Sequence, residues 1–202
     1  MKFLAQYPEF VEFRKRSGEA PVAEIITTSA ATPEEALYEA HERLRASLES
    51  ELLQQVKTAS PAFFERLVVD LLVRMGYGGS FRDAGQAVGK SGDGGIDGII
   101  KEDSLGLDAI YIQAKPWDGV LGRPEIQKFA GALQGHRARK GVVITTSSFS
   151  KDAVAYAEKI DSRIVLIDGV TLARHMVDHN VGVSLVTEYQ VKRVDSDYFT
   201  DK

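Results

Sequence analysis

The stretch Gly92-Asp93-Gly94-Gly95-Ile96-Asp97-Gly98 is followed, one short hairpin later, by Tyr111-Ile112-Gln113-Ala114-Lys115. Apolar runs on both sides of a polar turn predict two strands, over 96–101 and 109–115, that pair antiparallel. Because side chains alternate between the faces of a strand, Gln113 and Lys115 should point one way and Ala114 into the packing. If Asp97 lies on the neighbouring strand, a carboxylate, an amide and an ammonium meet at one place.

These groups suit a divalent cation and a phosphate. Mg²⁺ prefers oxygen ligands, which the Asp97 carboxylate, the Gln113 side-chain carbonyl and the Ala114 main-chain carbonyl supply. Lys115 would orient or deprotonate an attacking water and offset charge that develops on phosphorus. The pattern therefore indicates metal-dependent phosphodiester hydrolysis. The alternative, a surface lysine at a strand end with glycines that only form turns, explains each residue singly but not their combination.

Bulk composition sets limits on the class of protein. A chain of 202 residues, 44% hydrophobic and 27% charged, is long enough for one sizeable core, so we expect one main domain with an extension. The absence of cysteine excludes disulfides, thiolate metal sites and cysteine nucleophiles. No apolar run approaches the length of a membrane span, so we expect a cytoplasmic protein that does not bind a membrane.

Charge is unevenly distributed along the chain. The net charge of −4 disfavours a protein whose whole surface binds nucleic acid. Residues 34–65 hold seven Glu against three basic residues, whereas residues 115–140 hold six basic residues against Asp118 and Glu125. The basic segment directly follows the candidate site, where a phosphate backbone would lie. A solvated helix face explains the same charges equally well.

The chain divides into an N-terminal appendage with a connector helix, residues 1–57, and a main domain, residues 58–202. Thr32-Pro33-Glu34-Glu35 predicts a capped helix start, and the helix should end near Lys57. Its apolar stripe consists of Leu37, Leu44, Leu48, Leu52 and Val56. The stripe should pack against another apolar surface, in its own domain or in a partner protein. Residues 1–31 read as an appendage or linker.

The main domain alternates helices and strands. Ser60-Pro61 should start a core helix that ends at Gly76, with Phe63 and Phe64 on its apolar face and Glu65 beside that face. A polar loop over 80–95 precedes the two strands described above. The helix from Pro124 to Gly135 should bury a stripe of Ile126, Phe129, Ala130 and Leu133. The remaining predicted elements are a buried strand over 141–146, a helix over 152–159, a strand over 163–167, a helix over 170–177 and an edge strand over 183–194. This order predicts an α/β fold with a mixed central sheet flanked by helices.

Several other motifs lack the context that their chemistry needs. Residues 84–91 resemble a phosphate-binding loop, but no strand precedes them and no helix follows. His175 and His179 have the spacing of zinc ligands on a helix, but positive charge at a helix C-terminus explains them at lower cost. A calcium loop from Asp93 fails because Ser104 stands where a glutamate is needed. The hydroxyls of 145–148 have no neighbouring base and should cap the next helix.

The ordered set of motifs resembles the Mrr-type restriction endonucleases, a branch of the PD-(D/E)xK nuclease superfamily. The resemblance covers about residues 58–183. It is carried by Phe64-Glu65, Leu71-Leu72, Met75-Gly76-Tyr77-Gly78, Gly92 to Gly98, Gln113-Ala114-Lys115, Ile144-Thr145-Thr146-Ser147, Phe149-Ser150 and Leu166-Ile167-Asp168-Gly169. The glutamine at 113 replaces an acidic residue, a variant that this branch typically carries.

The resemblance implies a restriction-endonuclease-like fold and a role for each matched residue. Asp97 would be the metal carboxylate, Gln113 the second ligand, Lys115 the catalytic lysine and Glu65 the acid that completes the site. Asp93 would support the site from outside or simply form a turn. The metal would be Mg²⁺ or Mn²⁺. DNA-backbone contacts fall to Arg123, Gln127 and Lys128.

The resemblance also implies a function and partners. It indicates an endonuclease that cuts double-stranded DNA as a homodimer or higher oligomer, in restriction of foreign or methylated DNA. Members commonly carry an N-terminal winged-helix domain that reads DNA, which the residues before 58 are too few to form, so we expect it to be separate or missing. A non-catalytic DNA-binding or assembly module and a structure-selective junction nuclease remain as alternatives. No sequence or methylation preference is assigned.

Overall fold

The computed structural model describes residues 32–78, 95–102 and 108–200. By its internal contacts the chain divides into two compact units, Met1–Leu44 and Arg45–Lys202. The predicted appendage 1–31, the loop 80–94 with the phosphate-loop-like segment and Asp93, and the turn between the first two strands lie outside the described residues. Within the described residues, no helix is both long and apolar enough to cross a membrane.

Helix α2, Pro33–Lys57, begins at the predicted capping box. The Glu35 N–H donates to Thr32 Oγ1 over 3.2 Å, and the Thr32 N–H donates to the Glu35 carboxylate over 2.7 Å. Leu52 and Val56 are buried in the core of the second unit. The predicted apolar stripe is therefore covered only at its C-terminal end, and the exposed fractions of Leu37, Leu44 and Leu48 are 47%, 72% and 38%.

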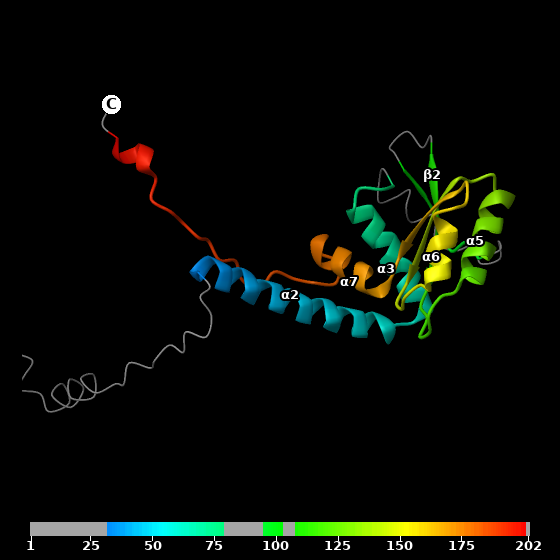
Figure 1. Ribbon diagram of the computed structural model, residues 1–202, viewed down its shortest axis with the longest axis horizontal. Helices are drawn as coiled ribbons and strands as arrows, with labels where there is room; N and C mark the ends of the chain where they lie inside the picture. Colours follow the sequence, from blue (N-terminus) through cyan, green and yellow to red (C-terminus); the bar gives the residue numbers. More distant parts are fainter. Residues whose placement is uncertain (1–31, 79–94, 103–107, 201–202) are drawn as a thin grey trace, which may run out of the picture. The chain divides into compact units, whose positions relative to one another are not determined.

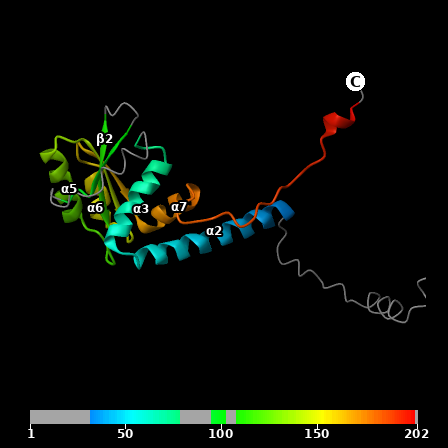
Figure 2. The same cartoon turned by 180° about the vertical axis from the view of Figure 1, so that it is seen from behind.

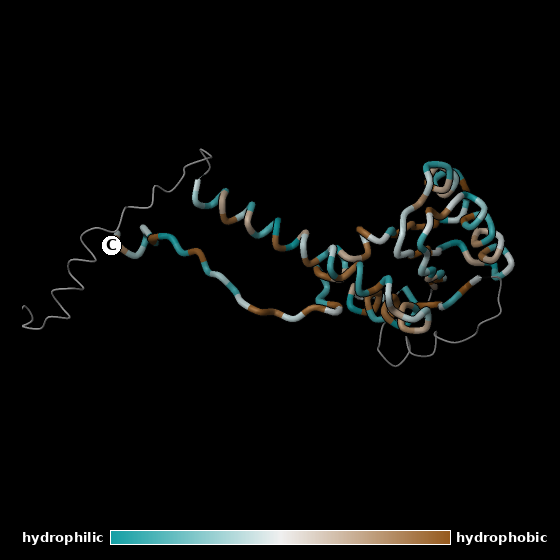
Figure 3. The backbone as a smooth tube through the Cα atoms, turned by 90° about the horizontal axis from the view of Figure 1, so that it is seen from below, coloured by the Kyte–Doolittle hydropathy of each residue, from teal (hydrophilic) through white to brown (hydrophobic). Residues whose placement is uncertain are grey.

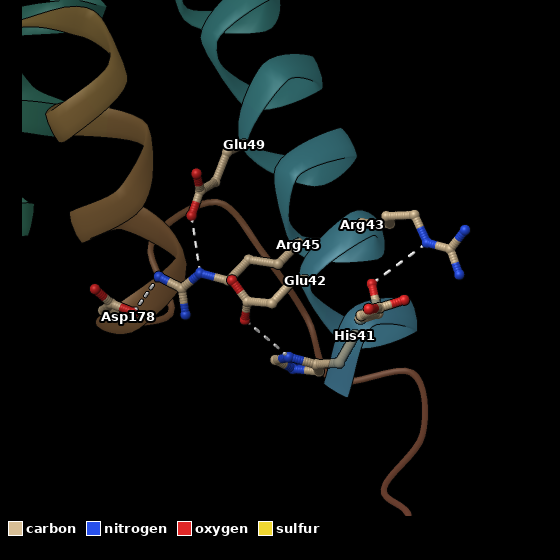
Figure 4. Close-up of polar contacts among 7 residues, drawn as sticks. His41, Glu42, Arg43, Arg45, Glu49 and Asp178 are labelled. Atoms are coloured by element: carbon tan, nitrogen blue, oxygen red, sulfur yellow. Dashed lines mark hydrogen bonds and ion pairs between the residues drawn. The ribbon is translucent and has the colours of Figure 1, made fainter. Parts of the chain in front are cut away.

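An ion-pair network joins α2 to a later helix inside the second unit (Figure 4). Arg45 donates from Nε to Glu49 over 2.9 Å and from Nη2 to Asp178 over 2.5 Å. Asp178 is the last residue of helix α7, Gly169–Asp178. Arg45 and Asp178 are 133 positions apart in the sequence. Their ion pair therefore links the middle of α2 to the end of α7.

Helix α3, Pro61–Arg74, starts as predicted at the Ser60 cap, where the Phe63 N–H donates to the Ser60 hydroxyl. Its apolar face, with Phe64 and Leu71 fully buried, packs on the sheet. Phe63, predicted on the same face, is 46% exposed. The helix thereby carries Glu65 to the margin of the core.

The described part of the chain forms one mixed four-stranded sheet in the order β1-β2-β3-β4. The strands are β1, Gly98–Lys101; β2, Ala109–Lys115; β3, Lys140–Thr145; and β4, Arg163–Ile167. β1 and β2 pair antiparallel, as predicted, and the other neighbours pair parallel. β3 is buried from Gly141 to Thr145, because helices cover both faces of a strand inside a parallel sheet.

Helices pack on both faces of this sheet (Figures 1 and 2). One core cluster joins α3, α7 and the end of α2 to residues such as Ile112 and Ile144. The other joins α5, Arg123–Gly135, and α6, Lys151–Ala157, to residues such as Val143. The predicted buried positions of α5 are confirmed: Ile126, Phe129, Ala130 and Leu133. The predicted α/β fold with a mixed sheet flanked by helices is therefore confirmed.

The predicted edge strand over 183–194 is wrong. Residues 183–195 have no regular secondary structure, and only a short 3-10 turn, Ser196–Phe199, follows. The segment is extended, with hydrophobic stretches along it (Figure 3), and Val186 is 93% exposed. Its composition favours a strand, but a strand forms only by hydrogen bonding to a neighbour, and no pairing with the described strands exists.

Candidate functional site

Asp97 lies directly before β1, where it is tied to β2 by both its main chain and its side chain. Its N–H donates to the carbonyl of Ile112 over 2.8 Å, and its Oδ2 accepts the N–H of Ala114 over 2.8 Å. At the end of the β1–β2 ladder, the Asp97 carboxylate thus accepts the Ala114 N–H in place of a main-chain carbonyl. The predicted approach of Asp97 to the Gln113-Ala114-Lys115 strand is observed.

Gln113 lies inside β2 and is 5% exposed. Its Oε1 atom is buried and has no hydrogen-bond partner among the residues that the structure describes. The turn before Asp97 passes close to the same side chain. Gly95 has a φ of +104°, and a Cβ added there would lie only 3.0 Å from Gln113 Nε2, so this position favours glycine. A buried acceptor without a partner costs about 1–3 kcal/mol, a cost that a ligand bound to this oxygen would offset.

Lys115, at the end of β2, is held by two neighbours. Its ammonium forms an ion pair with Glu125 in the first turn of α5. The same ammonium lies 4.8 Å from the ring centroid of Trp117, a cation–π contact. Lys115 is charged and partly exposed at the sheet edge where Asp97 lies, and its charge acts to lower the pKa of that carboxyl.

Two carboxylates share a partly dehydrated environment at this edge. Burial raises the pKa of Asp97, while the Ala114 N–H and the charge of Lys115 oppose the shift. Burial, and then the charge of Asp97, raise the pKa of Glu65. Glu65 is therefore within electrostatic reach of Asp97 although the two are separated by 32 positions in the chain. Both anions would be stabilised by a cation between them.

The predicted ligands are oxygen atoms of the kind that a small divalent cation such as Mg²⁺ prefers. They are the carboxylates of Glu65 and Asp97, the main-chain carbonyl of Ala114 and the Gln113 Oε1, which has no partner within the described part of the chain. No group of three or more His, Cys, Asp or Glu side chains gathers anywhere in the described residues. A metal at this site would therefore depend on the amide of Gln113.

The three residues predicted to contact DNA lie on α5, on the side turned away from the core. Arg123, Gln127 and Lys128 are all exposed, and the guanidinium of Arg123 lies 5.0 Å from the ring centroid of Tyr156. At the far end of the basic segment, Lys140 pairs with Glu102 and Asp108 and is thereby neutralised locally. The other basic side chains of this segment are exposed at both ends of α5, with Arg123 and Lys128 on the helix and Arg137 and Arg139 after it.

Three residues near the site were not predicted. Glu125 pairs with Lys115, Trp117 contacts the same ammonium, and Thr146 bonds to the main chain of Trp117. In the sequence, Glu125 is only an acid in the first helical turn, a position that the helix dipole favours in any helix. Its pairing depends on where α5 docks, so no local signal reveals it.

The interaction of Glu125 with Lys115 leads to a prediction. Glu125→Ala should slow DNA cleavage about tenfold, because the ammonium loses the acceptor that orients it. Glu125→Gln should recover most of the rate, since an amide oxygen still accepts a hydrogen bond from Lys115. The rates are measured by single-turnover cleavage, with Glu158→Ala, an exposed acid after α6, as the control. Equal rates for Glu125→Ala and the unaltered protein would contradict this positioning role.

The described histidine pair does not form a metal site. His175 and His179 lie with ring centroids 6.4 Å apart near the end of α7, and no third metal-ligating side chain joins them within the described residues. Helix α6 is capped by Ser150, beyond the predicted 145–148 run. Within that run, Thr146 is 2% exposed and bonds instead to the loop after β2.

The chain is similar to a curated protein and to a solved structure. The chain is 41% identical over 196 residues to the type IV methyl-directed restriction enzyme EcoKMrr of Escherichia coli K12, an alignment that covers 97% of this chain. The chain spans 62% of the length of that relative. A solved structure, the MspJI restriction endonuclease in complex with a 27-mer oligonucleotide, is 28% identical with a TM-score of 0.47, over 68% of this chain and 33% of that one.

A family model extends over the elements that build the site. The restriction endonuclease model Mrr_cat matches residues 56–176, from the end of α2 almost to the end of α7. The matched region includes Glu65, Asp97, Gln113 and Lys115. More than half of the chain is matched, and the chain therefore belongs to the Mrr-type family of restriction endonuclease catalytic domains.

Proposed function

We propose that this chain is a divalent-metal-dependent DNA endonuclease domain that hydrolyses phosphodiester bonds in double-stranded DNA. The observation that carries the proposal is the buried Oε1 of Gln113, which lacks a partner among the described residues and lies on the strand that binds Asp97 and ends at Lys115. An oxygen without a partner, two carboxylates with raised pKa values and an adjacent lysine form a set suited to a metal and a phosphate.

Each residue has a distinct proposed role. Asp97, Glu65, Gln113 and the carbonyl of Ala114 would hold Mg²⁺ or Mn²⁺. The bound metal would supply Lewis-acid polarisation of the phosphate and a more acidic water. The Lys115 ammonium would bind a non-bridging phosphate oxygen and offset the negative charge that grows there. The exposed Arg123, Gln127 and Lys128 would contact the DNA backbone.

The substrate and assembly follow from the relatives as proposals. The relative in E. coli is described as methyl-directed, so we propose modified DNA as the substrate, in cytoplasmic restriction of foreign DNA. One such site cuts one strand, and cleavage of both strands would therefore need a homodimer or higher oligomer. A separate winged-helix domain would supply recognition of the DNA.

A non-catalytic DNA-binding module is the second candidate. One observation favours it: Gln113 is neutral, and among the described residues only Glu65 and Asp97 are assigned as anionic ligands at the proposed metal position. Binding of a hard cation weakens as anionic ligands are removed. A structure-selective nuclease would share all the proposed residues and differ only in the DNA that it prefers.

The deciding experiment is cleavage of a panel of DNA substrates by the purified chain. We expect supercoiled plasmid to become nicked and then linear with Mg²⁺ or Mn²⁺, and chelation of the metal to stop the reaction. The panel contains unmethylated plasmid, methylated plasmid and a branched junction. Preference for methylated plasmid supports the restriction proposal, and preference for the junction supports the structure-selective alternative. DNA binding without cleavage under every metal would contradict the endonuclease proposal.

A further inference from the structure

Trp117 is an exposed aromatic residue two positions after Lys115. It is the single tryptophan of the chain, and 47% of its surface is exposed. Val120, in the same loop between β2 and α5, is 60% exposed. Two apolar side chains are therefore exposed in the loop that follows the lysine of the proposed site.

The loop that carries Trp117 is held firmly at both ends. The Trp117 N–H donates to Thr146 Oγ1 over 3.0 Å, and the Thr146 hydroxyl donates to the Trp117 carbonyl over 3.2 Å. At the other end, Leu121 is 1% exposed and exchanges main-chain hydrogen bonds with Ser148 and Ser150. The exposure of Trp117 thus results from a defined loop conformation.

The indole ring itself has a defined position next to Lys115. The Lys115 ammonium lies 4.8 Å from the ring centroid, and a Cβ added at Gly119 would lie 3.3 Å from the indole Nε1. Gly119 therefore lets the loop pass close to the ring edge. With these neighbours in place, 47% of the residue is still exposed.

We propose that Trp117 packs against the base or deoxyribose of the nucleotide next to the phosphate that Lys115 binds. The proposal rests on the proposed function, because it needs a DNA phosphate at Lys115. In a nucleotide the sugar and base are covalently joined to that phosphate, so they come within reach of an aromatic ring that touches the same ammonium. In complexes with single-stranded nucleic acid, aromatic contacts of this kind add affinity without requiring a particular base sequence. In a duplex, the deoxyribose or a base that has left the stack offers such a contact.

The test uses the fluorescence of Trp117, which is unambiguous because the chain has no other tryptophan. The protein is the full chain with Asp97→Asn, which prevents cleavage, and the probe is a short fluorescein-labelled duplex, methylated or unmethylated. Tryptophan emission and fluorescein anisotropy are recorded in parallel titrations, with the emission measured on unlabelled duplex. We expect the emission to change, by quenching or by a blue shift, over the concentration range in which anisotropy reports binding.

Substitutions provide the second arm. Trp117→Ala should weaken DNA binding about tenfold, the loss expected for one aromatic contact with a nucleotide, and Trp117→Phe should keep most of the affinity. Val170→Ala, at an equally exposed apolar residue on α7, should bind as the unaltered chain does. The affinity of Trp117→Ala is measured in the Asp97→Asn background, in which DNA is bound but not cleaved. A movement of Lys115 that slows cleavage therefore does not enter the measurement.

The outcomes separate this inference from the proposed function. Anisotropy that shows binding while tryptophan emission stays unchanged would overturn the role of Trp117 and leave the endonuclease proposal intact. Binding by Trp117→Ala equal to that of the unaltered chain would also overturn it. Failure of the unaltered chain both to bind and to cleave every DNA of the panel would overturn the two proposals together.

Discussion

Asp97→Ala and Lys115→Ala should each reduce plasmid cleavage about 10³-fold or more, the largest effect that we expect for any single substitution in this chain. Loss of Asp97 removes a proposed metal carboxylate and also the acceptor of the Ala114 N–H. Loss of Lys115 removes the cation whose charge lowers the pKa of Asp97 and which would bind the phosphate. Conversion of supercoiled plasmid to nicked and linear forms over time measures both effects.

The controls for these variants are residues of the same type outside the site. Asp161→Ala and Lys159→Ala change exposed side chains near α6 and should cut at the rate of the unaltered chain. Circular dichroism establishes that each variant is folded. Asp97→Asn should also abolish cleavage, because the negative charge is lost, but it should disturb the fold less. Its amide oxygen still accepts the hydrogen bond from the Ala114 N–H. Cleavage at an undiminished rate by folded Asp97→Ala or Lys115→Ala would refute the assigned site.

Gln113→Leu should separate stability from activity. The substitution removes a buried oxygen that has no partner among the described residues, so the unfolding temperature should stay the same or rise. Cleavage should fall about 100-fold or more, because leucine offers no oxygen to a metal. A thermal melt and the plasmid assay on one preparation measure both quantities.

Gln113→Glu should have the opposite effect on both quantities, with a lower unfolding temperature and retained cleavage. A third carboxylate beside Asp97 and Glu65, whose pKa values are already raised, should lower the unfolding temperature in metal-free buffer. Mg²⁺ should restore that temperature, and cleavage should be retained. The exposed Gln134→Leu on α5 is the matched control and should change neither quantity. Normal cleavage by Gln113→Leu would exclude the amide oxygen as a ligand.

Much of the fold could be predicted because its signals are local. The Thr32 capping box, the Ser60 cap and the buried positions of α5 involve residues within one or two helical turns. The β1–β2 hairpin is also local, so its antiparallel pairing and the approach of Asp97 to Gln113 and Lys115 followed from alternation alone. The edge strand over 183–194 failed for the converse reason: residue type favours a strand, but a distant partner must be present.

The sequence by itself determined the order of elements as far as α7, the two-faced sheet and the Asp97-Gln113-Lys115 set, since each depends on short spacings along the chain. Only the tertiary structure decided that Glu65 lies within electrostatic reach of Asp97, that Glu125 and Trp117 hold the Lys115 ammonium, and that the Gln113 oxygen has no partner among the described residues. These relations join different elements, and their distances depend on how α3 and α5 pack against the sheet. Side-chain packing sets those positions, and no local spacing encodes them.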